Sequence, residues 1–324
     1  TRVDGMLVFG SELKVLFAHP GVKRQFDAEG VYHQLMQTVV PGSTAFEGIH
    51  QVRPGYVLDV QRRDGDLHIE ERKYWDMNFP CEADRPAKYD EEEWIEAVRS
   101  GLLEAVQLRL EADVPVGCYL SGGIDSCAIT GLAAAARQNP VKAFTIGFDN
   151  TEYDESSIAT EMAESAGADH DLMMLDAGHL YDNFVETIWH TERTIYNTLG
   201  VAKLLMSRHV QNVGYKVVLT GEGSDELFGG YPAVRRDMFL QGLDHLSASE
   251  RSEWEQLLAE QNKLFKGAML AEDEISNAAL NDRIGFTPSC LQPWLASAIR
   301  VPDLLTDDLK SQLAGYDPGA AIAS

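Results

Sequence analysis

Two short glycine-rich segments contain most of the residues that could do chemistry. The first, residues 121–126, reads Ser-Gly-Gly-Ile-Asp-Ser and follows an apolar run at 114–120 that is predicted to be a buried strand. Glycine lets backbone N–H groups come close to a ligand, and the start of the following helix offers more N–H donors to phosphate oxygens. Ser121 and Ser126 add hydroxyl donors. The segment is therefore predicted to hold a pyrophosphate.

An acidic residue within this segment predicts a metal ion as well. Asp125 would repel a bare phosphate, so its position suggests a Mg²⁺ that bridges its carboxylate and the pyrophosphate. A tight connection between strand and helix is the simpler alternative for the two glycines. The segment lacks the Gly-Lys-Ser/Thr ending of the P-loop and the three spaced glycines of the dinucleotide fingerprint.

The second segment, residues 220–231, reads Thr-Gly-Glu-Gly-Ser-Asp-Glu-Leu-Phe-Gly-Gly-Tyr and follows an apolar strand at 216–219. Its acidic residues Glu222 and Asp225 stand just after a strand, where a parallel α/β sheet places its ligands. An acidic, capped turn before a helix is the alternative when this segment is considered alone.

The elements around these segments predict an α/β fold with a doubly wound parallel sheet. Strands are expected at 143–148 and 171–175, and helices at 127–136, 156–166, 181–190 and 201–213. A further helix at 90–111 has an apolar stripe that is predicted to cover one face of the sheet. The stripe consists of Trp94, Ile95, Val98, Leu102, Leu103, Val106 and Leu110. Residues 1–79 are instead β-rich, with a hairpin signal around 62–66, and a linker is expected at 75–89.

The two glycine-rich segments together resemble the synthetase domain of the glutamine-hydrolysing asparagine synthetases, which is an N-type ATP pyrophosphatase; the β-lactam synthetases share this scaffold. Residues 1–79 are similar to the closing part of that family's N-terminal-nucleophile glutaminase domain. The similarity lies in the Ser-Glu-Leu-Lys turn at 11–14, Arg-Pro-Gly at 53–55 and Tyr-Trp-Asp at 74–76. The resemblance implies two domains, 1–79 and 80–324. It also implies that the cysteine nucleophile and a later catalytic lysine lie outside this sequence, which is expected to be part of a longer protein.

The resemblance implies an AMP-forming ligase that uses ATP and Mg²⁺. Aspartate would be adenylated with release of pyrophosphate, and glutamine-derived ammonia would then give asparagine. Glu222 would be the base, and Asp125 and Asp225 would coordinate the metal. The positions that correspond to nucleotide contacts are Leu120, Ser121, Gly122, Gly123, Asp125, Ser126, Ile146, Thr220 and Gly221. Two alternatives are open: a synthetase that adenylates another carboxylate, such as a β-lactam-forming one, and a non-catalytic nucleotide-binding or assembly protein.

Charge and composition limit the partners. The net charge is −24, with 51 acidic against 27 basic residues, which disfavours nucleic acid and anionic membranes as partners. Small-molecule substrates and a cytoplasmic location are expected, and a homodimer is an open alternative. Arg193 or Lys203 could pair with a substrate carboxylate, although an ordinary surface salt bridge explains either residue equally well.

Two further residue types are interpreted as structural. Four cysteines without CxxC spacing support neither zinc nor a disulfide framework. Cys118 and Cys127, on either side of the first segment, are expected to be buried small hydrophobes. His170 stands before a strand. Its two alternatives are a place near the nucleotide and a structural role at the start of the strand, and the structural role is the commoner for such a residue.

Overall fold

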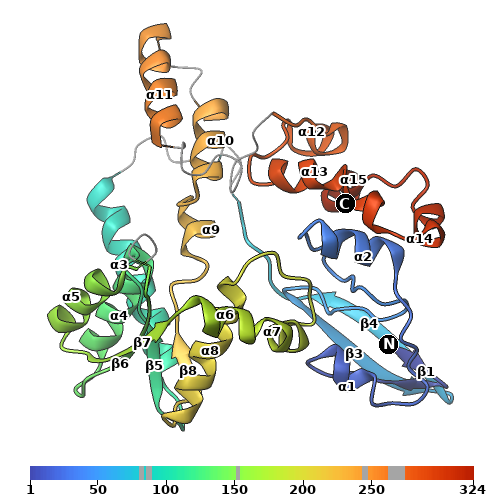
Figure 1. Cartoon of the computed structure of the whole chain (residues 1–324), viewed down its shortest axis with the longest axis horizontal. Coiled ribbons are helices and arrows are strands. Elements are labelled where there is room, and N and C mark those ends of the chain that lie inside the picture. The colour runs from blue at the N-terminus through green and yellow to red at the C-terminus, as the bar shows by residue number, and fades with distance from the viewer. Residues whose placement is uncertain (80–83, 85–89, 151–153, 243–246, 262–273) are drawn as a thin grey trace. The chain divides into compact units, whose positions relative to one another are not determined.

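The computed structural model describes the whole chain except residues 80–83, 85–89, 151–153, 243–246 and 262–273 (Figure 1). Two compact units divide the chain. The first unit comprises Thr1–Phe79, Glu192–Thr194 and Gly229–Ser324, and the second comprises Pro80–Thr191 and Ile195–Phe228. The domain division predicted from the sequence, 1–79 and 80–324, stays a prediction, and most of the expected linker lies outside the described residues.

The second unit is built on a parallel sheet. Its described residues form four strands in the order β7-β6-β5-β8. The strands are β5 (Val116–Tyr119), β6 (Lys142–Phe148), β7 (Asp169–Leu175) and β8 (Val217–Leu219). The helices of this unit are α3 (Glu91–Leu110), α4 (Ile124–Ala136), α5 (Ser156–Ala166), α6 (Ala177–Asp182), α7 (Phe184–Thr191), α8 (Leu199–Asn212) and α9 (Ser224–Phe228).

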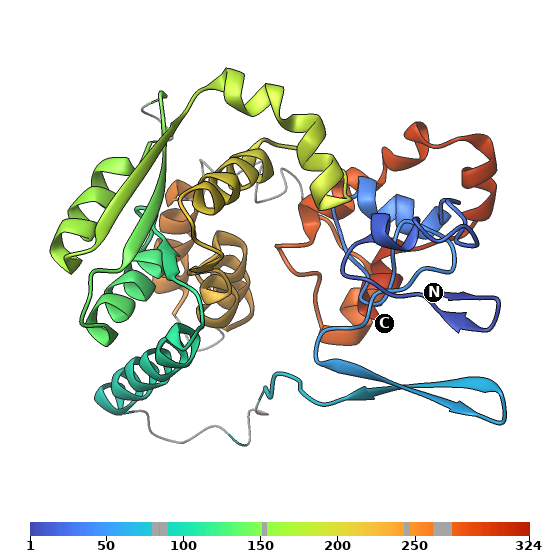
Figure 2. The same cartoon turned by 90° about the horizontal axis from the view of Figure 1, so that it is seen from below.

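Helices cover both faces of this sheet. Because neighbouring side chains of a strand point to opposite faces, Ala143 packs against α5 while Phe144, the next residue of β6, packs against α8. Leu120 joins Ala143 on the α5 face. Figure 2 shows the strands lying between α4 and α5 on one side and α8 on the other. The predicted doubly wound α/β fold is confirmed.

The predicted apolar stripe of the first long helix is only partly correct. Val106 in the C-terminal half of α3 is buried and packs beside α4 and β5. Trp94, Ile95 and Val98 in the N-terminal half are 54%, 51% and 39% exposed. The reason is geometric: α3 has 20 residues and β5 only 4, so the helix extends well beyond the strand.

A second correction concerns the helix expected at 181–190, which is two helices, α6 and α7. The chain leaves the helical conformation at Asn183, whose backbone φ is −102° and ψ 8°. The Asn183 side-chain amide donates to the carbonyl of His179 at 2.8 Å. This local hydrogen bond replaces a helical one, as short polar side chains often do at helix ends.

The first unit is built from short helices and two hairpins. Its strands are β1 (Arg2–Val3), β2 (Met6–Leu7), β3 (Tyr56–Arg63) and β4 (Asp66–Lys73). Its helices are α1 (Leu13–Leu16), α2 (Ala28–Leu35), α10 (Pro232–Gly242), α11 (Ala248–Gln261), α12 (Ala278–Ile284), α13 (Gln292–Ala298), η3 (Val301–Leu304), α14 (Asp307–Gln312) and α15 (Pro318–Ala323).

Hairpin β3–β4 confirms the turn predicted at 62–66. Asp64 and Gly65 form its two-residue loop, and their φ angles of 52° and 91° match the twist that such loops require.

The core of the first unit joins chain segments that are far apart in sequence. Tyr32 and Met36, in and just after α2, pack against Leu295 and Val301 near the C-terminus. The Tyr32 hydroxyl donates to the carbonyl of Ala298 at 2.8 Å. In neither unit does a helix of the described chain combine the length and apolarity needed to cross a membrane.

Candidate active site

Both glycine-rich segments follow neighbouring strands of the second unit. β5 pairs in parallel with β8, with Val116 opposite Val217 and Cys118 opposite Leu219. The loop after β5 and the loop after β8 therefore leave the same edge of the sheet. β5 has β6 as its neighbour on one side and β8 on the other. The chain goes from β5 to β6 and reaches β8 only later, so the order of the strands reverses at β5 and the ends of β5 and β8 form a topological switch point. Open α/β sheets bind their ligands at such a point.

The first loop is shaped by its own serines. The Ser126 hydroxyl accepts from the Ser121 backbone N–H at 3.0 Å and lies 2.8 Å from the Ser121 hydroxyl. The Ser121 hydroxyl in turn accepts from the Gly123 N–H at 3.2 Å. Ser126 is buried, so its hydroxyl serves the turn. These bonds fix the loop before any ligand binds.

Helix α4 begins at this loop without a side-chain cap. Its N-cap is Gly123, which has no side chain to accept from the N–H groups of the first turn. Such unpaired N–H groups and the positive end of the helix dipole favour an anion. The arrangement suits the predicted pyrophosphate, and the assignment itself stays a prediction.

Gly221 brings the second loop into contact with the first. A Cβ atom at Gly221 would lie 2.7 Å from Asp125 Cβ and 2.7 Å from the Ser126 backbone nitrogen, a distance that real side chains do not adopt. Only glycine therefore fits. Gly122 is similarly close to α5, because a Cβ there would lie 3.0 Å from Glu155 Cβ.

Glu222 forms an ion pair with Lys203 of α8. The Lys203 ammonium donates to Oε1 of Glu222, and the two side chains are 51% and 65% exposed. The Glu222 backbone N–H also donates to the Thr220 hydroxyl at 3.4 Å. Lys203 is one of the two cations proposed to pair with a substrate carboxylate. It lies in the second unit and contacts the candidate base.

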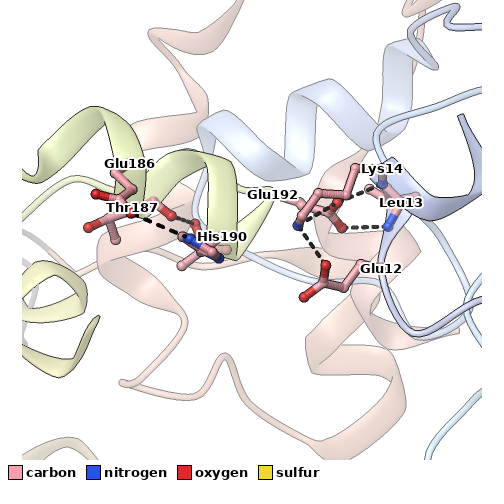
Figure 3. A network of polar contacts seen from close by, with 8 residues as sticks. Glu12, Leu13, Lys14, Glu186, Thr187, His190 and Glu192 are labelled. Carbon is pink, nitrogen blue, oxygen red and sulfur yellow. Dashed lines mark hydrogen bonds and ion pairs between the residues drawn. The ribbon is translucent and has the colours of Figure 1, made fainter. Parts of the chain in front are cut away.

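Arg193 belongs to the first unit, where its guanidinium donates to the carbonyl of Thr38 at 3.3 Å. The preceding residue, Glu192, has a φ of 54°. Its carboxylate accepts from the backbone N–H groups of Leu13 and Lys14 at 2.6 and 2.7 Å (Figure 3). The Ser-Glu-Leu-Lys turn noted in the sequence is thus held by a residue 178 positions later.

Leu120 and Ile146 were both expected to flank the adenosine. Leu120 is buried against α5, while Ile146 packs on the other face of the sheet with Met206 and Val210 of α8. Their side chains therefore join different apolar clusters. The shared nucleotide role stays a prediction.

A buried polar chain beneath the first loop was not predicted from the sequence. The Thr145 hydroxyl donates to the Leu120 carbonyl at 2.8 Å, and His170 Nε2 lies 2.9 Å from the same hydroxyl. Because a hydroxyl has one proton, Nε2–H is the donor to Thr145. Burial lowers the pKa of His170, which favours its neutral form. His170 therefore supports the end of β5, a structural role.

The metal prediction rests on Asp125 and Asp225. Each lies in the first turn of a helix, α4 and α9, at the edge where the two loops meet. Among the described residues, no cluster of three or more His, Cys, Asp or Glu side chains could hold a metal ion. Mg²⁺ characteristically uses one or two carboxylates and completes its shell with phosphate oxygens and water. Two carboxylates are a donor set that Mg²⁺ accepts when a nucleotide supplies the other oxygens, and the metal assignment stays a prediction.

The cysteines behave largely as expected. Cys118 is fully buried, and burial raises the pKa of its thiol to about 11, which keeps it unreactive. Cys127 is only partly buried, and its thiol faces the Ser121 carbonyl at 3.6 Å, so the prediction that it is a buried residue is wrong. Burial still raises the pKa of the Cys127 thiol. Cys81 lies outside the described residues.

A doubly wound sheet with a glycine-rich loop and an acidic loop at its switch point defines an α/β domain of the nucleotide-binding kind. Comparison with known proteins specifies it further. Residues 97–307 match the asparagine synthase family, and residues 1–75 match the glutamine amidotransferase domain family. The chain belongs to the asparagine synthase family.

Individual curated relatives are similar to this chain over part of their length. The chain is 37% identical over 259 residues to "Amidase chyE" of Penicillium rubens, an alignment that covers 76% of this chain and 37% of the relative. It is 30% identical over 248 residues to asparagine synthetase (glutamine-hydrolyzing) 3 of Bacillus subtilis, covering 72% and 39%. The chain thus spans well under half the length of these relatives.

Among solved structures, the NH3-dependent NAD synthetase of Campylobacter jejuni is similar at 16% identity and a TM-score of 0.32, with 68% of this chain and 91% of that chain covered.

Proposed function

We propose that this chain is the ATP-using part of an amide-forming ligase that activates a carboxylate as its AMP ester. The observation that supports this most directly is the close approach of Gly221 to Asp125 and Ser126, because it joins the pyrophosphate loop and the acidic loop into one site. Membership of the asparagine synthase family points to the same chemistry.

The proposed reaction has two steps. A carboxylate oxygen of the substrate attacks the α-phosphorus of ATP, and the bond between this phosphorus and the bridging oxygen breaks to release pyrophosphate. Ammonia then attacks the acyl carbon, the bond from that carbon to the AMP oxygen breaks, and AMP leaves. The nitrogen loses a proton as it forms the amide, and Glu222 is the proposed acceptor.

The residues divide between these steps. The N–H groups at the start of α4 and the Ser121–Gly123 turn bind the pyrophosphate, whose negative charge increases as it leaves. Asp125 and Asp225 would hold Mg²⁺, which neutralises charge on the phosphates when bound. Thr145 and His170 keep the end of β5 in place beneath the loop.

Aspartate is the first candidate for the acid, with ammonia from glutamine. The match of residues 1–75 to a glutamine amidotransferase domain favours glutamine as the ammonia source. A different carboxylate is the second candidate, and it is favoured by the relative named as an amidase.

The test is ATP–pyrophosphate exchange by the full-length protein with a panel of acids that starts with aspartate. We expect exchange with one acid and dependence on Mg²⁺. Glu222→Gln should keep exchange and lose amide formation by about 100-fold or more, since a general base contributes about 10²–10⁴-fold. Glu161→Gln, an exposed position on α5, is the matched control.

Binding of Mg·ATP without exchange for any acid would contradict the proposal and favour a non-catalytic nucleotide-binding protein. Loss of exchange and amide formation together in Glu222→Gln would contradict the role of Glu222 as the base.

A further inference from the structure

The cation that contacts the candidate base comes from helix α8. This helix runs back to the start of β8, so its N-terminal end lies at the sheet edge from which the two loops leave. Lys203 is in the second turn of α8, and the buried neighbours Val201, Ala202 and Met206 hold the helix against the unit. The position of Lys203 is therefore set by a packed element.

A chain of hydroxyl groups fixes the same turn to the end of β5. The Ser207 hydroxyl donates to the carbonyl of Lys203 at 2.8 Å and lies 3.2 Å from the Tyr119 hydroxyl. Since Ser207 gives its one proton to Lys203, the Tyr119 hydroxyl must be the donor to Ser207. Tyr119 is the last residue of β5, and only Leu120 separates it from the first loop. The backbone turn that carries Lys203 is thus linked to the strand that precedes the pyrophosphate loop.

The acidic composition of the two loops gives the positive charge of Lys203 a role in the site. Residues 121–126 and 220–226 contain four acidic residues and no lysine or arginine. The Lys203 ammonium supplies a positive charge beside Glu222. It contacts Oε1 of Glu222, which leaves Oε2 to accept a proton.

We infer that Lys203 is a positioning residue for the amide-forming step: its ammonium holds Glu222 in one orientation, with one carboxylate oxygen directed to the incoming amine. This inference rests on the proposed function. The pair contributes little to folding, because an exposed ion pair is screened by water and must hold two flexible side chains in one geometry. A large effect of removing Lys203 on one reaction step therefore cannot come from lost stability.

The experiment separates the two steps in the full-length protein. Pyrophosphate exchange with the best acid measures adenylation, and a single-turnover reaction of the preformed acyl-adenylate with ammonium chloride measures amide formation. We expect Lys203→Met to slow amide formation by about 10- to 100-fold, the cost of misplacing a catalytic group. Exchange should stay within about threefold of the unaltered protein, a margin set by the modest worth of an exposed ion pair.

Two further variants make the result specific. Lys203→Arg keeps the positive charge and a donor, so it should recover most of the amide-forming rate. Lys216→Met removes an exposed lysine just before β8, at the opposite edge of the sheet, and should leave both steps unchanged.

The outcomes distinguish this inference from the proposed function. An unaltered protein without exchange for any acid would overturn the proposed function and the role of Lys203 with it. If the unaltered protein catalyses exchange, the proposed function stands. Equal effects of Lys203→Met on both steps, or no effect on either, would then overturn the role of Lys203 alone. A raised KM for the acid in the exchange reaction would instead assign Lys203 to the substrate carboxylate.

Discussion

Gly221 is the residue through which the acidic loop touches the pyrophosphate loop. Its neighbours are the Cβ atom of Asp125 and the backbone of Ser126, neither of which can move without shifting the start of α4. Glycine is required here because there is no space for a Cβ atom. Its role is to let the two loops pack against each other.

Gly221→Ala is therefore expected to reduce pyrophosphate exchange by about 100-fold, because a displacement of about 1 Å at a reacting site has an effect of this size. Circular dichroism should show that the fold is kept. Gly101→Ala is the matched control, since a Cβ at Gly101 in α3 has no atom within 4 Å. Wild-type exchange in Gly221→Ala would show that the close contact of the two loops is dispensable.

At this scale the sequence predicts what is local and misses what depends on tertiary packing. Residues 121–126 and 220–226 are recognisable because each is a continuous string whose chemistry follows from adjacent residues. The pairs Lys203–Glu222 and Thr145–His170 are 19 and 25 residues apart and lie on different elements. Only the placement of α8, β6 and β7 in the fold brings their atoms together.

Among the elements, helix α3 shows how far a periodic pattern can be trusted. Its apolar stripe is continuous in the sequence, yet the structure buries Val106 at 4% exposure and leaves Val98 39% exposed. Periodicity identifies the face of a helix that is apolar, whereas the length of the neighbouring elements decides how much of that face is covered. The two valines provide a matched pair on one helix.

We expect Val106→Ala to lower the free energy of unfolding by about 2 kcal/mol, from two lost methyl groups and the cavity that they leave. Val98→Ala should change it by less than about 0.5 kcal/mol, as is usual for surface substitutions. Urea denaturation followed by circular dichroism measures both. Equal losses in the two variants would mean that the N-terminal half of α3 is covered in the full-length protein.

On the scale of the whole chain, the first unit unites three separate segments of sequence. Residues 1–79 supply α2 and both hairpins, 192–194 supply the carboxylate that binds the α1 backbone, and 229–324 supply most of the core partners of Tyr32. No local signal in the sequence indicates this assembly, because each contact spans more than 150 residues. Its polar centre is His33 of α2.

His33 makes one hydrogen bond within the N-terminal segment and one to the C-terminal segment. It is 3% exposed, its Nδ1 lies 2.7 Å from the Thr38 hydroxyl, and its Nε2 lies 2.7 Å from the Tyr316 hydroxyl. Burial lowers the pKa of His33, and burial raises the pKa of Tyr316 to about 12, so both groups are neutral at pH 7.

The sign of the resulting pH dependence follows from linkage. The unfolded chain binds a proton at His33 below about pH 6.5, while the folded chain resists protonation because its pKa is lower. The contribution of neutral His33 to the free energy of unfolding is therefore complete above that pH. It decreases as the pH falls, by at most about 1.4 kcal/mol per pH unit. The first unit should therefore lose stability between pH 7.5 and pH 5.5.

Hydrogen exchange of α2 and α15 in urea reports on this unit directly, since His33 lies in one helix and Tyr316 just before the other. We expect His33→Gln to be less stable than the unaltered protein at pH 7.5 and to lose less stability on acidification. His68→Gln, at an exposed position of hairpin β3–β4, should keep the full pH dependence. An unchanged pH dependence in His33→Gln would assign the acid sensitivity of the unit to other groups, because the buried imidazole would then have no part in it.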